Sequence, residues 1–257
     1  MVDNDVQNRK DTRNMKIDKV GVKNLKYPIV VQDRDNILQQ TIAEIDFFVE
    51  LPHYNRGTHM SRFIEVLNKY HQHDLIENLP EILKTIKKKL SADRAYINLK
   101  FPYFVRKKAP VSKIESLLNY EAIFLASYED DFKLSIGVEV PITTVCPCSK
   151  EMSDYGAHNQ RSVVKVQLKY DKFIWLEEII EYVEKTASCE VYPLLKRVDE
   201  KHVTEKGYDN PKFVEDIVRD LAIALKKDGR ITAFQISSEN YESIHNHNAY
   251  ASIEWQK

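Results

Sequence analysis

The chain has 257 residues, 43% of them hydrophobic and 30% charged, which is the balance of an ordinary globular protein with room for two domains. Its formal net charge is −1, so no overall positive field favours nucleic acid, and an anionic ligand would need a local basic cluster. No apolar run has the length of a membrane span, so no membrane partner is expected. Residues 1–14 are polar, lack the apolar core of a secretory signal and are expected to form a mobile arm.

The first half of the chain begins with strands and changes period near residue 59. Residues 41–51 alternate apolar and polar side chains, which predicts a half-exposed antiparallel strand. Residues 59–72 carry apolar side chains at helical spacing instead. By the same criteria we predict strands at 27–31, 41–51, 94–104 and 116–128, and helices at 59–72 and 79–90.

The second half repeats this order of elements. Residues 134–142 alternate most strictly, and residues 162–170 are the expected partner strand. A helix is predicted at 173–185, and a second one from an Asn210 cap and Pro211 to Gly229. Strands at 231–238 and 249–255 close the chain.

The repeated order predicts an α+β fold of two tandem modules, residues 15–130 and 131–257. Each module is expected to hold an antiparallel four-stranded sheet with helices on one face. Such sheets leave open edges, and oligomerisation into a closed barrel would cover them.

The chain has three cysteines, an odd number in a sequence without an export signal. We therefore expect reduced thiols and a cytoplasmic location. Cys189 lies in a helix-like stretch and is expected to be a small buried hydrophobe. Cys146 and Cys148 are therefore the remaining candidates for a functional thiol.

Both of these cysteines lie in TTVCPCSKEMSDYGAHNQRS, residues 143–162, directly after the strictly alternating strand. Pro147 lacks a backbone donor and marks the point where strand pairing stops. The separation of Cys146 and His158 fits no zinc finger, although a loop could fold back to bring them together. The pattern alone slightly favours two structural thiols over a metal site.

Two further segments concentrate polar side chains. In the segment 197–220, Glu200 lies in a charged loop, which is typical of a solvated surface, and Glu215 lies early in an apolar helix. The pattern favours the polar edge of that helix for Glu215, although a carboxylate there could also bind a ligand edge with two donors. Glu242, His245 and His247 crowd a short link between two strands, which favours a functional site.

At these residues the chain resembles a known family. PITTVCPCSKEMSDYGAHNQRS, NPKFVEDIVRDLA and ESIHNHNAYA closely resemble the signature segments of GTP cyclohydrolase type IB. VGVKNLKYPIVV and LPHYNRGTHMSRF are similar to that family as well. The resemblance spans nearly the whole chain after residue 14. One departure is Asn246, where the family often has a proline between the two histidines.

The resemblance implies a tunnelling fold, assembled into a homotetramer with sites at subunit interfaces. It implies hydrolysis of GTP to formate and 7,8-dihydroneopterin triphosphate, the first step of tetrahydrofolate biosynthesis. The second module would carry most of the active site.

The resemblance also implies a divalent metal. By motif, Cys146, His158 and Glu200 match the family's metal ligands, and Glu242 is expected nearby. Zinc is the default for such a set, while manganese or iron could also be accepted. Cys148 is expected to be a packed thiol.

The substrate contacts follow from the same motifs. Glu215 matches the carboxylate that anchors the guanine edge, and His245 and His247 match the acid/base histidines. The triphosphate needs local positive charge. For each basic candidate, an ordinary surface position without a binding role is an equal alternative. These candidates are Lys150, Arg161, Arg56 and Arg62.

Two other functions compete with this one. A related enzyme of the nitrile reductase type would use Cys146 as nucleophile and require a reduced nicotinamide, for which the sequence has no obvious fingerprint. A non-catalytic purine-binding module is the third hypothesis. The joint presence of Glu215, Glu242, His245 and His247 argues against it.

Overall fold

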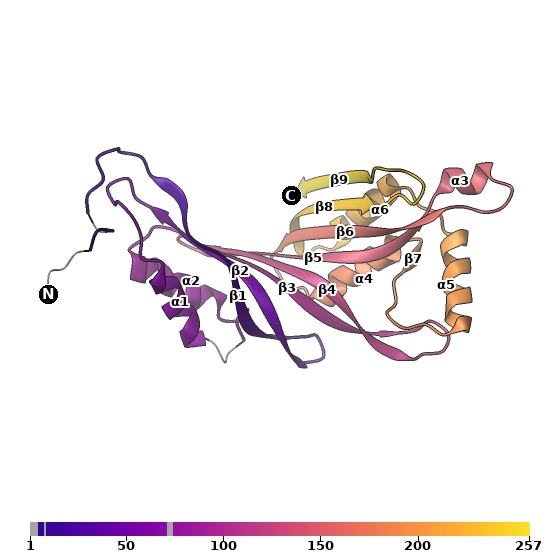
Figure 1. Ribbon diagram of the computed structural model, residues 1–257, viewed down its shortest axis with the longest axis horizontal. Helices are drawn as coiled ribbons and strands as arrows, with labels where there is room; N and C mark the ends of the chain where they lie inside the picture. The colour runs from indigo at the N-terminus through magenta and orange to yellow at the C-terminus, as the bar shows by residue number, and fades with distance from the viewer. Residues whose placement is uncertain (1–4, 8, 71–73) are drawn as a thin grey trace. The chain divides into compact units, whose positions relative to one another are not determined.

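The computed structural model describes residues 5–7, 9–70 and 74–257 (Figure 1). The expected mobile arm lies partly outside these residues. Its described part contacts the segment after β2, because Asp11 N donates to Tyr54 O at 3.0 Å and Gly57 N donates to Gln7 O at 3.1 Å. Among the described residues, no helix is both long enough and apolar enough to cross a bilayer.

The element bounds follow the chain. The described strands are β1 (Ile17–Gln32), β2 (Leu38–Leu51), β3 (Ala95–Lys108), β4 (Glu115–Tyr128), β5 (Phe132–Val145), β6 (Asn159–Tyr170), β7 (Cys189–Glu190), β8 (Ile231–Asn240) and β9 (Ala249–Gln256). The described helices are α1 (Ser61–Leu67), a 3-10 turn (Asn68–Tyr70), α2 (Leu79–Leu90), α3 (Pro147–Met152), α4 (Leu176–Thr186), α5 (Arg197–Asp209) and α6 (Val214–Lys227).

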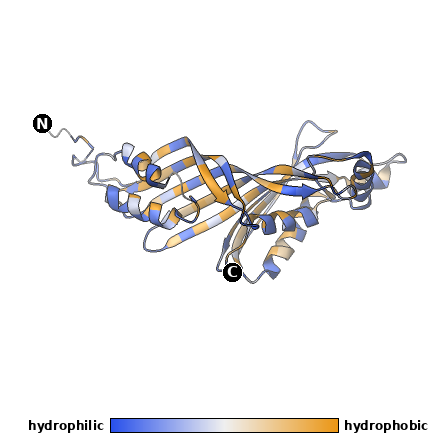
Figure 2. Cartoon of the chain, turned by 90° about the horizontal axis from the view of Figure 1, so that it is seen from below, coloured by the Kyte–Doolittle hydropathy of each residue, from blue (hydrophilic) through white to orange (hydrophobic). Residues whose placement is uncertain are grey.

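The strands pair in the order β1-β2-β3-β4-β5-β6-β8-β9, and β7 pairs with β5. β5 and β6 are antiparallel, with Val138 opposite Val166, so the predicted pairing of these two strands is confirmed. The protein is therefore a mixed fold with a large antiparallel sheet and few helices. Figure 2 shows the alternation of polar and apolar residues along the strands that gives the sheet its buried face.

The chain divides into two compact units. Unit 1 comprises residues 1–102 and 123–135, and unit 2 comprises residues 103–122 and 136–257. In unit 1, the apolar faces of α1 and α2 are buried, and the rings of Phe63 on α1 and Phe47 on β2 are 5.2 Å apart. Gly21 allows the close approach of β1 and β2, because a Cβ there would lie 2.0 Å from Phe47 O.

In unit 2, α6 packs on β8 and β9, and α4 packs on α6. Both helices bury a stripe at helical spacing, represented by Ile180 and Val183 on α4 and by Ile217 and Leu221 on α6. This packing stabilises the sheet by removing apolar surface from water. It also holds β8 and β9 in place, and the link between these two strands is part of the candidate site.

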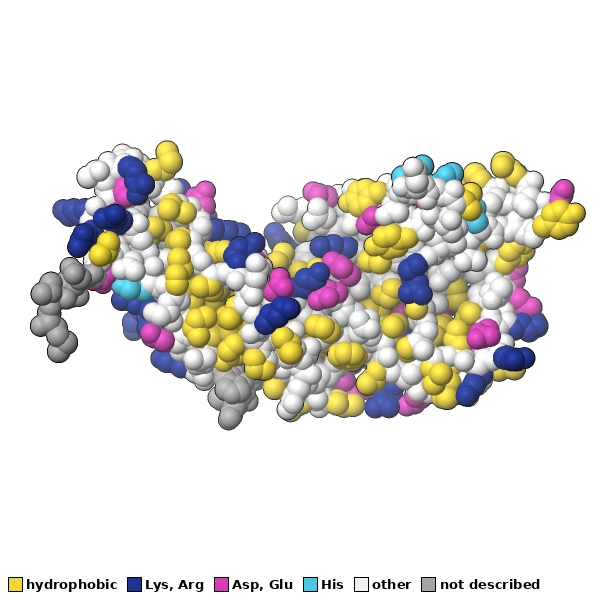
Figure 3. Space-filling view, in the orientation of Figure 1, with side chains coloured by type: hydrophobic (Ala, Val, Ile, Leu, Met, Phe, Trp, Pro, Cys, Tyr) yellow, Lys and Arg dark blue, Asp and Glu magenta, His cyan; other side chains and the backbone are white. Residues whose placement is uncertain are grey.

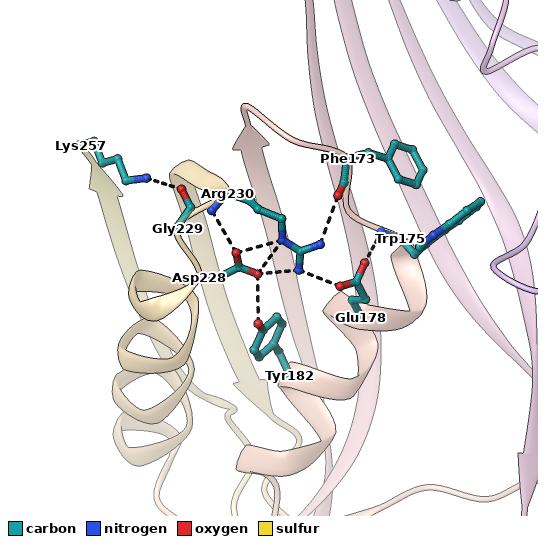
Figure 4. Close-up of polar contacts among 8 residues, drawn as sticks. All are labelled: Phe173, Trp175, Glu178, Tyr182, Asp228, Gly229, Arg230 and Lys257. Atoms are coloured by element: carbon teal, nitrogen blue, oxygen red, sulfur yellow. Dashed lines mark hydrogen bonds and ion pairs between the residues drawn. The ribbon is translucent and has the colours of Figure 1, made fainter.

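The Arg230 cluster, formed by Phe173, Glu178, Tyr182, Asp228 and Arg230, joins the start of α4 to the end of α6 (Figure 4). The Arg230 guanidinium donates to Glu178 Oε1 at 2.7 Å, to Asp228 Oδ1 at 3.0 Å and to the Phe173 carbonyl at 3.2 Å. Tyr182 Oη donates to Asp228 Oδ2 at 3.1 Å. The hydrogen bond from Arg230 is the main reason why the pKa of Asp228 falls to about 2.

The prediction that Glu200 lies in a charged loop is wrong, because this residue lies on α5. The helix has few buried side chains, which is why no apolar stripe announced it. Its first turn is fixed by Asp199, which accepts from Lys196 N at 2.9 Å and from Val111 N and Ser112 N at 2.8 Å each. Burial alone would raise the pKa of Asp199, but these bonds and the Ser112 hydroxyl outweigh it and lower the pKa well below its usual range.

Two smaller predictions in this part of the chain are also corrected. Asn210 ends α5 instead of capping the next helix, and α6 begins at Val214. The Asn210 amide donates to Ala187 O at 2.8 Å, so it is occupied outside α6. Cys189 is buried as predicted, but it lies in the short strand β7 and not in a helix.

Candidate functional site

The predicted cysteine lies where β5 ends. Cys146 follows the last residue of β5 and is the N-cap of α3, with Pro147 in the first turn of that helix. After α3 the chain turns back through Gly156, whose φ of +127° is readily adopted only by glycine. Cys146 N then donates to His158 O at 3.1 Å, just before β6 begins.

Ser149 links Cys146 to His158 a second time. Its hydroxyl donates to Cys146 O at 3.1 Å and accepts from His158 N at 3.2 Å. Ser149 N also lies 3.5 Å from Cys146 Sγ. The structure therefore brings together the two predicted ligands that come from the opening and the end of this segment.

The ring of His158 is tied to a buried polar network. Its Nδ1 lies 2.9 Å from Gln160 Oε1, and Gln160 Nε2 donates to Thr144 Oγ1 at 2.9 Å. Thr144 Oγ1 lies 3.0 Å from Ser162 Oγ. The side chains behind His158 are all buried, with Thr144 and Ser162 0% exposed and Gln160 5% exposed.

The link between β8 and β9 lies beside His158. Ser243 Oγ is 3.5 Å from His158 Nδ1, and Tyr241 N donates to Arg161 O at 3.0 Å. On this link the rings of His245 and His247 stack with centroids 5.1 Å apart, and both side chains are exposed. In Figure 3 cyan His side chains show at the surface over the region where Figure 1 places α3 and this link.

The two glutamates predicted in the long central segment lie on different helices. Lys212 N donates to Val145 O at 3.0 Å, which places the start of α6 next to the end of β5. Glu215 lies in the first turn of α6 and is exposed. Glu200 is exposed on α5. On the same helix, Gly207 faces Val145 at the end of β5, and Glu200 lies about 10 Å from Gly207 along the helix axis.

Within the described ranges, no group of three or more His, Cys, Asp and Glu side chains is close enough to hold a metal ion. Of the three predicted ligands, the structure brings together Cys146 and His158 and leaves Glu200 apart from them. Glu242 is half-buried on the β8–β9 link, next to Ser243. The structure thus links the main chains of Cys146 and His158 directly and through Ser149.

A cavity of about 300 Å³ lies between α5, β7 and the adjoining ends of β5 and β6. Its polar lining includes Arg161, Glu190, Tyr192 and Tyr208. Burial raises the pKa of Glu190, but the Lys206 ammonium, 2.8 Å from Oε1, lowers it more, so that the net pKa is below its usual value. Burial also raises the pKa of Cys189 to about 11, which keeps this thiol protonated at neutral pH.

The four basic candidates differ in what they contact. Lys150 Nζ donates to Tyr208 O and lies 4.3 Å from the centre of the Tyr208 ring. Arg161 is exposed on β6. In unit 1, Arg56 is exposed, and Arg62 Nη1 donates to Lys89 O at 3.0 Å at the end of α2.

The prediction that Cys148 is a packed thiol is wrong, since its side chain is exposed. The reason is local, because α3 has only six residues and none of them is buried. Cys146, two residues earlier, directly follows the last residue of β5 and is half-buried.

Sequence reasoning missed the residues that support the site. Gln160 and Ser162 fall in phase with Val164 and Val166, the inward positions of β6, so polar side chains at apolar positions were a readable signal. Ser149 gave no such signal, because its role depends on the fold of the loop.

A family model described as Type I GTP cyclohydrolase folE2 matches residues 4–251. The GTP cyclohydrolase FolE2 of Magnetococcus marinus is 57% identical over 251 residues, which cover 97% of this chain and 95% of that protein. The GTP cyclohydrolase FolE2 of Citrifermentans bemidjiense is 53% identical over 250 residues, which cover 97% of this chain and 94% of that protein.

Among solved structures, uricase from Arthrobacter globiformis superposes with a TM-score of 0.54 at 7% identity and covers 93% of each chain. Urate oxidase from Bacillus subtilis gives 0.53 at 10% identity, covering 95% of this chain and 99% of that one. These two likenesses concern the fold alone. The sequence matches extend over the site segments described above, and the chain belongs to the type I GTP cyclohydrolase folE2 family.

Proposed function

We propose that this chain is a GTP cyclohydrolase of folate biosynthesis that hydrolyses GTP to formate and 7,8-dihydroneopterin triphosphate. Family membership over 97% of the chain supports the activity. The observation that carries the site is the double link between Cys146 and His158, made by a backbone bond of 3.1 Å and by Ser149. The histidine-bearing β8–β9 link lies beside this pair through Ser243.

A divalent metal is part of the proposal. A half-buried thiol and an imidazole on two residues whose main chains are linked suit zinc, and a carboxylate as third ligand would also admit manganese or iron. Cys146 and His158 would hold the metal, with Glu200 as third ligand and Glu242 near it. When bound, the metal supplies a water activated for attack at neutral pH.

The other residues bind the substrate and move protons. The Glu215 carboxylate would accept two N–H groups from the guanine edge, which orients C8 of the base. His245 and His247 would exchange protons with the ring nitrogens and the ribose as the imidazole ring opens and formate leaves. Arg161 and Lys150 would bind the triphosphate, and Lys150 would first have to leave the Tyr208 carbonyl.

We propose that the chain adopts the tunnelling fold, with modules at 15–130 and 131–257, and assembles in the cytoplasm as a homotetramer. The support is that β1 and β9 each have one strand neighbour in the pairing order, which leaves an edge for another copy. Joining copies would also offer a route by which a carboxylate of one chain reaches the pair on another. Light scattering coupled to size exclusion measures the assembly.

Formate release from GTP tests the activity, with zinc, manganese or iron added to metal-free protein. The expected result is release with at least one metal and none without metal. A folded protein that releases no formate with any of the three contradicts the proposal. Covalent trapping of substrate on Cys146 in metal-free protein would instead support a nucleophilic cysteine.

A further inference from the structure

We propose that Gln160 is a positioning residue that fixes the tautomer of His158, holding the proton on Nδ1 and leaving the Nε2 lone pair available. Thr144 and Ser162 would set the orientation of the Gln160 amide. The inference deepens the proposed metal-dependent function and rests on it for its biological meaning. The tautomer itself is a property of the metal-free chain.

The geometry that carries the inference is a line of hydrogen bonds behind the site. It runs from His158 Nδ1 to Gln160 Oε1 at 2.9 Å, from Gln160 Nε2 to Thr144 Oγ1 at 2.9 Å, and from Thr144 Oγ1 to Ser162 Oγ at 3.0 Å. Because Gln160, Thr144 and Ser162 are at most 5% exposed, water does not compete for these groups. A buried amide of this kind is costly to leave unpaired, so its orientation is well determined.

The direction of donation decides the tautomer. If Gln160 Nε2 donates to Thr144, its Oε1 is the acceptor that faces His158, and His158 Nδ1 must carry the proton. With the amide turned over, Nε2 would donate to Nδ1, and the ring proton would move to Nε2. Only the first arrangement leaves the Nε2 lone pair free to bind a metal.

The far end of the line favours the first arrangement. Ser162 on β6 is the register partner of Asn240 on β8, so both side chains lie on the same buried face. Asn240 Oδ1 is buried and has no hydrogen-bond partner within the part of the chain that the structure describes. An open acceptor on this face suits donation that runs from His158 through Gln160 and Thr144 to Ser162, since the Ser162 proton is then free to turn towards this face.

One other group lies near His158 Nδ1. Ser243 Oγ is 3.5 Å away and belongs to an exposed residue, so its contact is long and open to water. The Gln160 contact is shorter and buried, and we assign the tautomer to it. Ser243 therefore provides a matched control, since it contacts the same nitrogen from the solvent side.

The first experiment needs no variant. Long-range ¹H–¹⁵N correlation spectra of metal-free protein with ¹⁵N-labelled histidine report which ring nitrogen of His158 is protonated, and His158→Asn identifies the signal. The expected result is a neutral ring with the proton on Nδ1. A ring with the proton on Nε2 overturns the inference.

The second experiment measures zinc affinity by competition with a chromophoric chelator. Gln160→Met keeps the side-chain length but removes the acceptor, and the expected loss of affinity is roughly 10–100-fold. Gln160→Glu restores an acceptor and should stay within about threefold of wild type, as should Ser243→Ala. Wild-type affinity in folded Gln160→Met overturns the inference, and Thr144→Val, with a smaller loss expected, replaces it if Gln160→Met does not fold.

The two proposals fail in different ways. Wild-type protein that binds no zinc, manganese or iron contradicts the proposed metal-dependent function, while the NMR spectrum still decides the tautomer. Equal zinc affinity in wild-type protein and in folded Gln160→Met contradicts only the positioning role.

Discussion

Two polar clusters of unit 2 differ in how far their groups are already paired: the Arg230 cluster at the ends of α4 and α6, and the site around His158. In the first, Arg230 meets two carboxylates and a carbonyl, and Asp228 receives a further bond from Tyr182. In the second, His245 and His247 are exposed and stack on each other, and the Cys146 thiol is half-buried. The polar groups of the first cluster hydrogen-bond one another, as expected for a structural role. The second cluster presents donor atoms that a ligand can bind.

The largest expected effect comes from removing the Cys146 thiol from the site around His158. Cys146→Ala should lose bound metal and reduce formate release below detection, because a principal ligand is absent. Metal analysis and a formate assay on the same preparation measure both effects. Cys148→Ala is the matched control, since this exposed thiol is expected to leave metal content and turnover unchanged. Normal metal content in Cys146→Ala would show that the ligand set is wrong.

The stacked histidines separate proton transfer from metal binding. His245→Ala and His247→Ala should each lower kcat by about 10²–10⁴-fold, the usual contribution of a general acid or base. Their metal content should stay at the wild-type level, because neither residue is a proposed ligand. Loss of metal in either variant would place that histidine in the ligand set instead.

A smaller effect is expected at the start of α6. Glu215→Gln removes a charged acceptor from the guanine edge and should lower kcat/KM by roughly 10–100-fold, the range for a hydrogen bond to a charged group. Binding of GTP measured by calorimetry should weaken with it. Asp216, the next residue, accepts from Phe213 N at 2.9 Å as part of the helix cap, so Asp216→Asn provides a stability control rather than a binding one. Unchanged kcat/KM in Glu215→Gln would contradict the assignment.

The smallest expected effect comes from the Arg230 cluster, where a substitution should change the stability of the fold and leave the catalytic activity unchanged. The pKa of Asp228 is lowered from 3.8 to about 2, so its charged form stabilises the fold above pH 4 and this stabilisation is lost as the pH falls towards 2. Asp228→Asn should cost on the order of 2 kcal/mol of unfolding free energy at pH 7, and the difference from wild type should shrink below pH 4. Urea unfolding at pH 7 and pH 3 measures this difference. A difference that does not change with pH would contradict the linkage.

The sequence predicted most strands because their alternation is local. Residues 134–142 and 162–170 were predicted as partner strands, and they pair as β5 and β6. α5 escaped prediction because the contacts that define its start are made by Asp199 to the distant Val111 and Ser112. A helix fixed by polar contacts from elsewhere in the chain leaves no apolar period to read.

The site was predictable in its residues but not in its arrangement. Pattern alone could not choose between thiols and a metal site at Cys146, because the link through Ser149 exists only once the loop has folded. Glu200 matched a ligand by motif, yet the structure of the single chain leaves it on the exposed side of α5. The role of Gln160 could have been suspected from its inward phase in β6, which normally carries an apolar residue.

From the strand order we expect the strands to join the sheet in a particular order during folding. From β1 to β6 every strand pairs with the strand that precedes it in the chain, and all of these connections are short except residues 52–94, which carry α1 and α2 before β3. β8 must wait for residues 171–230, which carry α4, β7, α5 and α6, before it reaches β6. His158 lies before this excursion and His245 after it. A refolding chain should therefore recover most of its sheet signal before the two sides of the site meet, and activity should return last.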